Sequence, residues 1–286
     1  MESTRVCVTG SSSYLGSWLV KSLREKGYAS KVRLRKGLVP NGEHNRLRLF
    51  EADIYSPFQF EPAIQGCKYV FHLATPLQHD PKNTQFKDTS EAAVSGLMSI
   101  VESCIKSGTV KRLIYTASVV AASPIKDSGN GFKEVLDESC WTPFNLSFLH
   151  ANEGFLITLS EKELLRLNEN GDLELEVVSI TCGLVGGDTL LPTLAESVGV
   201  LTSQVTNNKA RYQVLRFLEE LLGKVPIVHI KDVCEAHILC MEKPSITGRF
   251  LCATAYLSSA EVASHWKKYH PEINIGEGLV LFVNKN

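Results

Sequence analysis

Short apolar runs alternate along most of this chain with longer segments whose apolar residues recur at helical spacing. The alternation predicts βαβ units, because the central strands of a parallel sheet are buried on both faces and read as continuous apolar runs. Leu97, Ile100, Val101 and Cys104 have helical spacing, and Gly108 follows where that helix should stop. We therefore predict an α/β protein with a doubly wound parallel sheet. The segments that carry the pattern are RVCVTG, SWLVKSLREKG, KYVFHLAT, EAAVSGLMSIVESCIKSG, RLIYTASV, EKELLRLNENG and LELEVVSITCGLV.

The pattern changes near residue 186, where polar helices and short strands replace the long apolar runs. The segment PIVHIKDVCEAHILCMEK then returns to a strand followed by a helix. We assign residues 1–185 to a first domain, to which residues 225–242 return. Residues 186–224 and 243–286 are assigned to a smaller C-terminal lobe.

The charge balance argues against two classes of partner. The chain has 30 basic and 31 acidic residues, so it has no charge excess that would attract nucleic acid or an anionic membrane surface. Its first residues, MESTRVCVTG, lack the basic and then apolar regions of a signal peptide, and no window approaches a membrane-spanning length of uninterrupted apolar residues. We therefore expect a cytoplasmic protein.

The eight cysteines are scattered through apolar segments and include no C-x-x-C pair. This distribution predicts buried, reduced thiols and neither disulfides nor a metal site. His72 and His237 have no cysteine or carboxylate at a metal-ligand spacing nearby, so we interpret both as core or helix residues.

The stretch VTGSSSYLG joins a predicted strand to a predicted helix. A turn that binds a dinucleotide needs glycine where the chain turns, where it approaches the pyrophosphate and where helix meets strand. Gly10 and Gly16 occupy the outer two places, and Ser13 occupies the middle one. The sequence predicts a phosphate cradle at the helix start, in which the serine hydroxyls can donate hydrogen bonds. The alternative is a plain strand-to-helix turn.

Five segments resemble the plant group of extended short-chain dehydrogenases that contains dihydroflavonol reductase, anthocyanidin reductase and cinnamoyl-CoA reductase. They are VTGSSSYLGSWLVKSLREKGY, FEADIY, AIQGCKYVFHLATP, SGTVKRLIYTASVVAASP and DESCWTP. The resemblance extends over nearly the whole chain. It implies a Rossmann-like dinucleotide-binding domain with a smaller substrate lobe, and NADP(H) as cofactor in the reduction of a small-molecule carbonyl compound.

The resemblance also assigns site residues. It implies that Ser118 is the catalytic serine that orients the substrate oxygen, that Asp53 and Ile54 lie beside the adenine, and that Cys182 and Leu184 face the nicotinamide. Read without the resemblance, Asp53 could end a strand and Ser118 could bond neighbouring backbone. The remaining implied cofactor contacts are Thr9, Gly10, Ser12, Ser13, Tyr14, Leu15 and Gly16 in the turn, and Leu73, Ala74 and Thr75 beneath the cofactor.

The chain departs from this family where the catalytic helix should begin. The family protonates the product oxyanion with a tyrosine whose pKa is lowered by a lysine four residues later, on the same helix face. Aligned through TLSEKELL, these positions hold Glu153 and Ile157; aligned through HANE, several residues that include both are missing. Thr158 and Glu161 have the spacing of a capping box, which predicts a helix that starts one turn late.

Two further departures lie elsewhere. After EKGYA, the family has a strand ending in an arginine that binds the 2'-phosphate of NADPH, and we expect this strand to be deleted here. The alternative is a short strand over 32–35, with Arg33, Arg35 and Lys36 as a replacement clamp. The ending, INIGEGLVLFVNKN, also loses the family pattern, so the substrate lobe is expected to be truncated.

These observations leave three hypotheses. The first is an NADPH-dependent oxidoreductase of flavonoid or phenylpropanoid compounds whose activity is impaired, because a missing general acid typically costs about 10²- to 10⁴-fold in rate. The second is a catalytically inactive nucleotide-binding or interaction protein. The third is an altered gene product, whose missing strand would expose a sheet edge.

Overall fold

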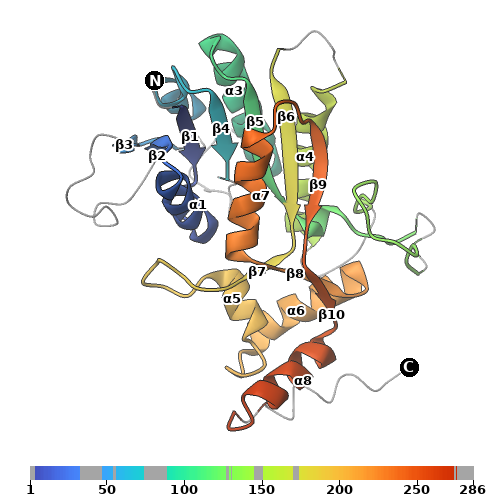
Figure 1. The fold of residues 1–286 in the computed structure, drawn as a ribbon. Coiled ribbons are helices and arrows are strands. Elements are labelled where there is room, and N and C mark those ends of the chain that lie inside the picture. The colour runs from blue at the N-terminus through green and yellow to red at the C-terminus, as the bar shows by residue number, and fades with distance from the viewer. Residues whose placement is uncertain are drawn as a thin grey trace.

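A computed structural model describes residues 4–32, 47–53, 56–73, 89–126, 129, 131–144, 151–169, 174–273 and 275. Its centre is a seven-stranded sheet in which every neighbouring pair of strands is parallel (Figure 1). In spatial order the strands are β3 (Leu47–Leu49), β2 (Ala29–Val32), β1 (Arg5–Thr9), β4 (Tyr69–His72), β5 (Arg112–Ser118), β6 (Glu176–Cys182) and β9 (Gly248–Cys252).

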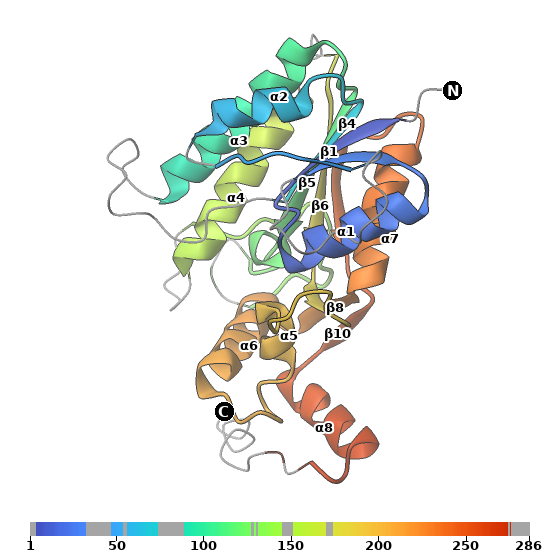
Figure 2. The same cartoon turned by 90° about the vertical axis from the view of Figure 1, so that its left-hand side faces the viewer.

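Helices cover both faces of this sheet (Figure 2). Helices α1 (Tyr14–Glu25) and α7 (Ile230–Glu242) pack against each other on one face. The other face carries α2 (Glu61–Ile64), α3 (Thr89–Ser107) and α4 (Ala151–Arg166). Each face has its own apolar core, as expected for strands buried on both sides. The predicted doubly wound, Rossmann-like fold is confirmed.

A second, three-stranded sheet lies beyond the carboxyl ends of β6 and β9 (Figure 1). Its order is β10 (Ala255–Leu257), β8 (Val225–His229) and β7 (Leu184–Gly186). Helices α5 (Glu196–Leu201), α6 (Lys209–Leu222) and α8 (Ser259–Tyr269) belong to the same end of the molecule. Two short 3-10 helices are η1 (Pro57–Phe60) and η2 (Val119–Ala121).

The expected deletion of the second strand is wrong. Strand β2 begins at Ala29, directly after α1, and its backbone pairs with β1 on one side and β3 on the other. The short-strand alternative is nearer to the structure, although the strand begins and ends about three residues earlier than that reading placed it. Arg33, Arg35 and Lys36 lie outside the described residues.

The proposed late start of the fourth helix is also wrong. Helix α4 begins at Ala151, so Thr158 lies in its interior. The side chain of Glu161 forms an ion pair with Arg249 of β9 and is therefore directed into the protein, where it cannot cap a helix start. The predicted helix over 91–107 is confirmed in α3, and Gly108 follows it with a φ of 62°.

Candidate cofactor site

The turn between β1 and α1 has the backbone geometry that a phosphate cradle needs. Gly10 adopts a φ of 69°, a conformation that favours glycine, and its carbonyl accepts a hydrogen bond from the Ser13 amide at 2.9 Å. A Cβ atom on Gly16 would lie 2.2 Å from the Gly10 carbonyl oxygen and 2.6 Å from the Ser11 Cα atom. Both outer glycines are therefore required by the close approach of strand and helix.

The middle position of the turn does not need glycine. Ser13 is the N-cap of α1, with an extended backbone at φ −80° and ψ 172° that any residue adopts. Its Oγ accepts a hydrogen bond from the Gly16 amide at 3.0 Å, which satisfies one of the unpaired amides at the helix start. Because that oxygen acts as acceptor, its hydroxyl hydrogen can still be donated to an anion.

The start of α1 is tied to the segment that follows β7. The Tyr14 hydroxyl donates to the Gly187 carbonyl at 3.0 Å, and the Trp18 indole donates to the Asp188 carbonyl at 2.8 Å. Burial, and secondarily the charge of Asp188, raises the pKa of Tyr14 to about 12, so this hydroxyl stays protonated at neutral pH. Leu15 packs against the apolar core beside α7. These anchors hold the cradle in place.

Thr9 joins the carboxyl ends of β1 and β4. Its hydroxyl lies 2.7 Å from Nδ1 of His72 and accepts a hydrogen bond from the Leu73 amide at 3.3 Å. Burial lowers the pKa of His72 to about 4, so the ring is neutral at physiological pH. Thr9 and Leu73 therefore lie together at the carboxyl ends of β1 and β4. Ala74 and Thr75 lie outside the described residues.

Asp53 follows β3, the outermost strand of the seven-stranded sheet on the side of β1 and β2. Its amide donates to the Gln59 side-chain oxygen at 2.9 Å, and its carbonyl accepts from the Ser56 amide at 2.9 Å. The side chain is exposed. The turn that sequence reasoning offered as an alternative is present, and it leaves the carboxylate facing solvent. Ile54 lies outside the described residues.

Ser118 and Cys182 end two neighbouring strands and face each other in register. Ser118 is half-buried and is the N-cap of η2, where its Oγ accepts from the Val120 amide at 3.5 Å. Both sequence interpretations of Ser118 therefore remain compatible, because a capping oxygen can still donate its hydrogen. The Cys182 thiol is buried, and its pKa lies well above the usual value. Leu184, in β7, packs against the apolar core around α6.

Helix α4 has no lysine side chain where the resemblance would place one. Ile157 is half-buried and packs against the apolar core between the sheet, α3 and α4. Glu153 is in the first turn of the same helix, and its side chain lies outside the described part. Lys162 lies over the rings of Trp141 and Phe144 at 5.0 and 4.9 Å. Desolvation, followed by the charge of Arg249, lowers the pKa of that lysine.

A buried charge network lies one helical turn beyond Ile157. Both carboxylate oxygens of Glu161 bond the Arg249 guanidinium, at 3.0 and 2.9 Å, and both side chains are almost fully buried. Ser179 and Thr181 of β6 donate to the same carboxylate at 2.6 and 2.7 Å. The guanidinium also stacks on Trp141 at 3.7 Å and donates to backbone carbonyls of Ala121, Glu138 and Cys140. Sequence reasoning missed this network, because no local spacing connects its members.

The two histidines are satisfied inside the core, as the sequence predicted. His237 lies 2.7 Å from the Thr116 hydroxyl and 2.7 Å from the Val233 carbonyl, and burial lowers its pKa to about 4. Among the described residues there is no group of three potential metal ligands. All eight cysteines lie in the described part of the chain, and none of them forms a disulfide. Within the same part of the chain, no helix combines the length and apolar character needed to cross a membrane.

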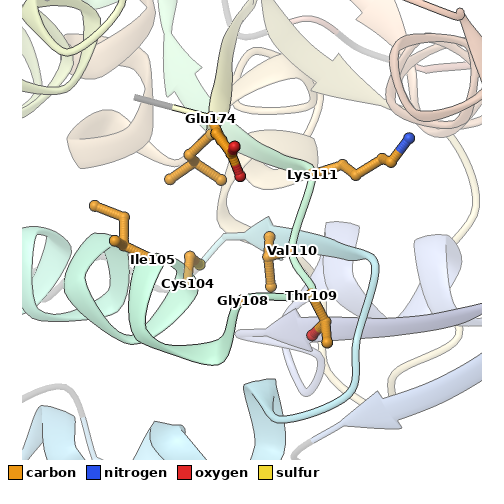
Figure 3. Close-up of a pocket in the computed structure, with 8 residues that line it drawn as sticks. Cys104, Ile105, Gly108, Thr109, Val110, Lys111 and Glu174 are labelled. Carbon is orange, nitrogen blue, oxygen red and sulfur yellow. The ribbon is translucent and has the colours of Figure 1, made fainter. Parts of the chain in front are cut away.

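A pocket of about 440 Å³ lies at the opposite edge of the sheet, between the end of α3 and the amino ends of β5 and β6 (Figure 3). It is lined by Cys104, Ile105, Gly108, Thr109, Val110, Lys111, Glu174 and Leu175. Ligands of open α/β sheets bind beyond the carboxyl ends of the strands. This pocket is therefore separate from the candidate cofactor site.

Comparison with known proteins agrees with this geometry. A sequence model of the NAD dependent epimerase/dehydratase family matches residues 6–250. Anthocyanidin reductase of Vitis vinifera is 33% identical over 94% of this chain and 82% of its own length. Dihydroflavonol 4-reductase of Callistephus chinensis is 32% identical over 93% of this chain and 74% of its own length.

Solved structures give the same result for the fold. Vestitone reductase from alfalfa, Medicago sativa, superposes with a TM-score of 0.77 and 31% identity, covering 95% of this chain and 83% of the alfalfa chain. The yeast reductase Gre2, crystallised with NADPH, has the same fold with a TM-score of 0.71 and 19% identity, over 95% of this chain and 85% of its own. This chain belongs to the NAD dependent epimerase/dehydratase family.

Proposed function

We propose that this chain binds NADP(H) across the carboxyl edge of the seven-stranded sheet. The cradle between β1 and α1 carries this proposal, because Gly10 and Gly16 allow the close approach and Ser13 caps the helix without closing the turn. The first turn of α1 contains no acidic side chain that would repel a phosphate. The pyrophosphate would lie against the turn residues and the adenine beside Asp53 and Ile54. The nicotinamide would lie near Leu73, Cys182 and Leu184.

We propose further that the ligand opposite the cofactor is a flavonoid or phenylpropanoid compound with a carbonyl or CH–OH group. Relatives named for anthocyanidin, dihydroflavonol and vestitone support this substrate class. NADPH supplies a hydride when it is bound, and the Ser118 hydroxyl would orient the substrate oxygen. The substrate would lie toward the end of the molecule that carries the three-stranded sheet and helices α5, α6 and α8. Eight cysteines that form no disulfide fit a reducing cytosol.

Turnover in this proposal is slow. In the alignment through TLSEKELL, Ile157 stands where the resemblance requires a lysine, and an aliphatic side chain packed on the core cannot lower the pKa of a neighbouring acid. Loss of a positioned general acid costs about 10²- to 10⁴-fold in rate. Proton delivery would depend on the Ser118 hydroxyl and bound water.

The same observation favours a second candidate function, a nucleotide-binding protein without turnover. The packing of Ile157 gives α4 a structural use for this position, and the buried Glu161–Arg249 pair holds the helix on the sheet without any catalytic group. This candidate predicts that the cofactor binds and that no carbonyl substrate is reduced. The third hypothesis loses one of its arguments, because β2 is present and pairs with β1 and β3.

Restoration of the missing pair separates the two candidates. The double variant Glu153→Tyr/Ile157→Lys is compared with the parent chain in NADPH oxidation assays with an anthocyanidin and a dihydroflavonol. The slow-reductase proposal predicts detectable parent turnover and a gain of about 10²- to 10⁴-fold in kcat. Ser118→Ala in the restored background is the matched control and should remove most of that gain.

Each outcome assigns the function. No turnover by the parent chain, with NADPH binding intact, would establish the second candidate. Parent turnover as fast as that of the restored variant would show that a different group delivers the proton, which would contradict the role assigned to the missing pair.

A further inference from the structure

Cys182 and Cys252 end two neighbouring strands at the place where both leave the large sheet. They are direct register partners at the carboxyl ends of β6 and β9. Gly183 alone separates β6 from β7, and two residues separate β9 from β10 (Figure 1). The Gly183 amide donates to the Cys252 carbonyl at 2.9 Å. A covalent bond at this pair would therefore join both crossovers between the two sheets.

The two thiols point to the same face of the sheet. Both cysteines belong to the apolar cluster beneath α7, together with Ile180 and Phe250, which precede them by two residues on their strands. The Cys182 thiol donates to the Ile180 carbonyl at 3.6 Å, and the proximity of the two cysteines shifts the pKa values of their thiols in opposite directions. Neighbouring strands lie about 4.8 Å apart, within the Cα separation of about 4.4–6.8 Å that a disulfide accepts.

The environments of the two thiols differ in a way that gives each a chemical role. Cys182 is 5% exposed, whereas Cys252 is only partly buried and so can meet a small oxidant. The contact with Cys182 lowers the pKa of the Cys252 thiol, while the same contact, with burial, raises that of Cys182. Burial raises the pKa of nearby Cys234 and Cys240 to about 12 and 11, so these two thiols stay protonated and unreactive.

We propose that Cys182 and Cys252 are a reversible redox pair that hydrogen peroxide converts to a disulfide. The Cys252 thiolate attacks one peroxide oxygen, the O–O bond breaks, and the departing hydroxide takes a proton to form water, which leaves a sulfenic acid on Cys252. The sulfur of Cys182 then attacks the Cys252 sulfur, loses its proton and releases a second water. Two thiols and one peroxide thus give one disulfide and two waters, and a dithiol reductant reverses the change.

A disulfide between Cys182 and Cys252 would be strained, and this strain would make the disulfide easy to reduce. Side chains directly opposite on neighbouring strands keep nearly the strand spacing between their Cβ atoms, which exceeds the 3.8 Å mean of relaxed disulfides. The ends of the two strands must therefore move slightly together when the bond forms. A strained disulfide is easier to reduce than a structural one. This inference does not depend on cofactor binding or turnover.

The test treats the folded, fully reduced chain with hydrogen peroxide, then traps free thiols in denaturant and maps the peptides by mass spectrometry. The proposal predicts a product lighter by two hydrogen atoms, with the peptides that contain Cys182 and Cys252 linked, and full recovery on treatment with dithiothreitol. A product that keeps all its thiols, links another pair or gains only oxygen would overturn the proposal.

Three variants assign the roles within the pair. Cys182→Ser should stop the reaction at a sulfenic acid on Cys252, which dimedone captures. Cys252→Ser should leave Cys182 reduced, because the buried Cys182 thiol is not the one that attacks the peroxide. Cys234→Ser is the matched control in the same cluster and should still form the link; loss of the link in this variant would contradict the assignment.

Discussion

Helices α1 and α4 flank the sheet on opposite faces. The residues at the start of α1 form a candidate binding turn, whereas those along α4 pack against the core. At the start of α1, Gly10 and Gly16 permit a tight strand-to-helix turn, and Ser13 caps the helix while its hydroxyl hydrogen can be donated to an anion. Along α4, Ile157 and Glu161 serve packing and a buried ion pair. The comparison separates two tasks: the start of α1 forms a turn with the geometry of a phosphate cradle, and Ile157 and Glu161 of α4 serve packing and ion pairing.

The largest expected effect is a loss of stability in a variant of helix α4. Glu161→Ala would leave the Arg249 guanidinium buried without its carboxylate, and we expect the free energy of unfolding to fall by about 3–5 kcal/mol. Glu163→Ala on the same helix is the control, since its pair with Arg166 is more exposed and is worth about 0–1 kcal/mol. Urea unfolding measures both. Equal, small losses would show that α4 does not depend on the buried pair.

The next largest effect is expected for a variant of the turn between β1 and α1. In Gly16→Ala, the new Cβ would lie 2.2 Å from the Gly10 carbonyl oxygen, so the turn must open. We expect a loss of about 1–3 kcal/mol in stability and at least an approximately tenfold weaker NADPH affinity, equivalent to about 1.4 kcal/mol. Ser12→Ala, in the same turn, controls for loss of a hydroxyl alone. If calorimetry gave the same NADPH affinity for Gly16→Ala as for the parent chain, the turn would not contribute to cofactor binding.

Protonation of the core histidines links stability to pH. His72 and His237 have pKa values of about 4 when folded and about 6.5 when unfolded, so the unfolded chain binds protons first as the pH falls. Stability is therefore complete above about pH 6.5 and is lost progressively between pH 6.5 and 4. His237→Gln should lower the slope of unfolding free energy against pH by up to about 1.4 kcal/mol per pH unit. An unchanged slope in urea titrations across this window would contradict the assignment.

The smallest effect concerns the serine that occupies the middle glycine position. Ser13→Ala removes the cap on the Gly16 amide and should cost about 1 kcal/mol of stability. Ser13→Gly should cost only a few tenths of a kcal/mol, because glycine is tolerated at an N-cap. NADPH affinity in Ser13→Gly should stay within about tenfold of the parent. A much tighter complex would show that the serine side chain obstructs the cofactor.

The sequence predicted the architecture because apolar runs and helical periods are local properties. Strand β2 was missed for a local reason: of its residues, ASKV, only the first and the last are apolar, and the strand is held by backbone pairing to β1 and β3. The start of α4 was misplaced because Glu161 finds its partner Arg249 88 residues away. The anchors from Tyr14 to Gly187 and from Trp18 to Asp188 have equally distant partners.

The residues of the candidate site were found only where a motif or a resemblance marked them. Gly10 and Gly16 follow from the steric needs of a strand-to-helix turn, which the sequence shows directly. Ser118 and Cys182 look like ordinary strand ends, and only the parallel register places them side by side. The function of a group brought together by tertiary pairing is not readable from spacing along the chain.

Calorimetric titration of the folded chain with NADPH tests the central claim, that the cradle still binds its cofactor although the acid is missing. We predict a dissociation constant in the micromolar range, about −8 kcal/mol of binding free energy. A chain that is compact by size exclusion and yet shows no heat of binding up to millimolar NADPH would contradict the account.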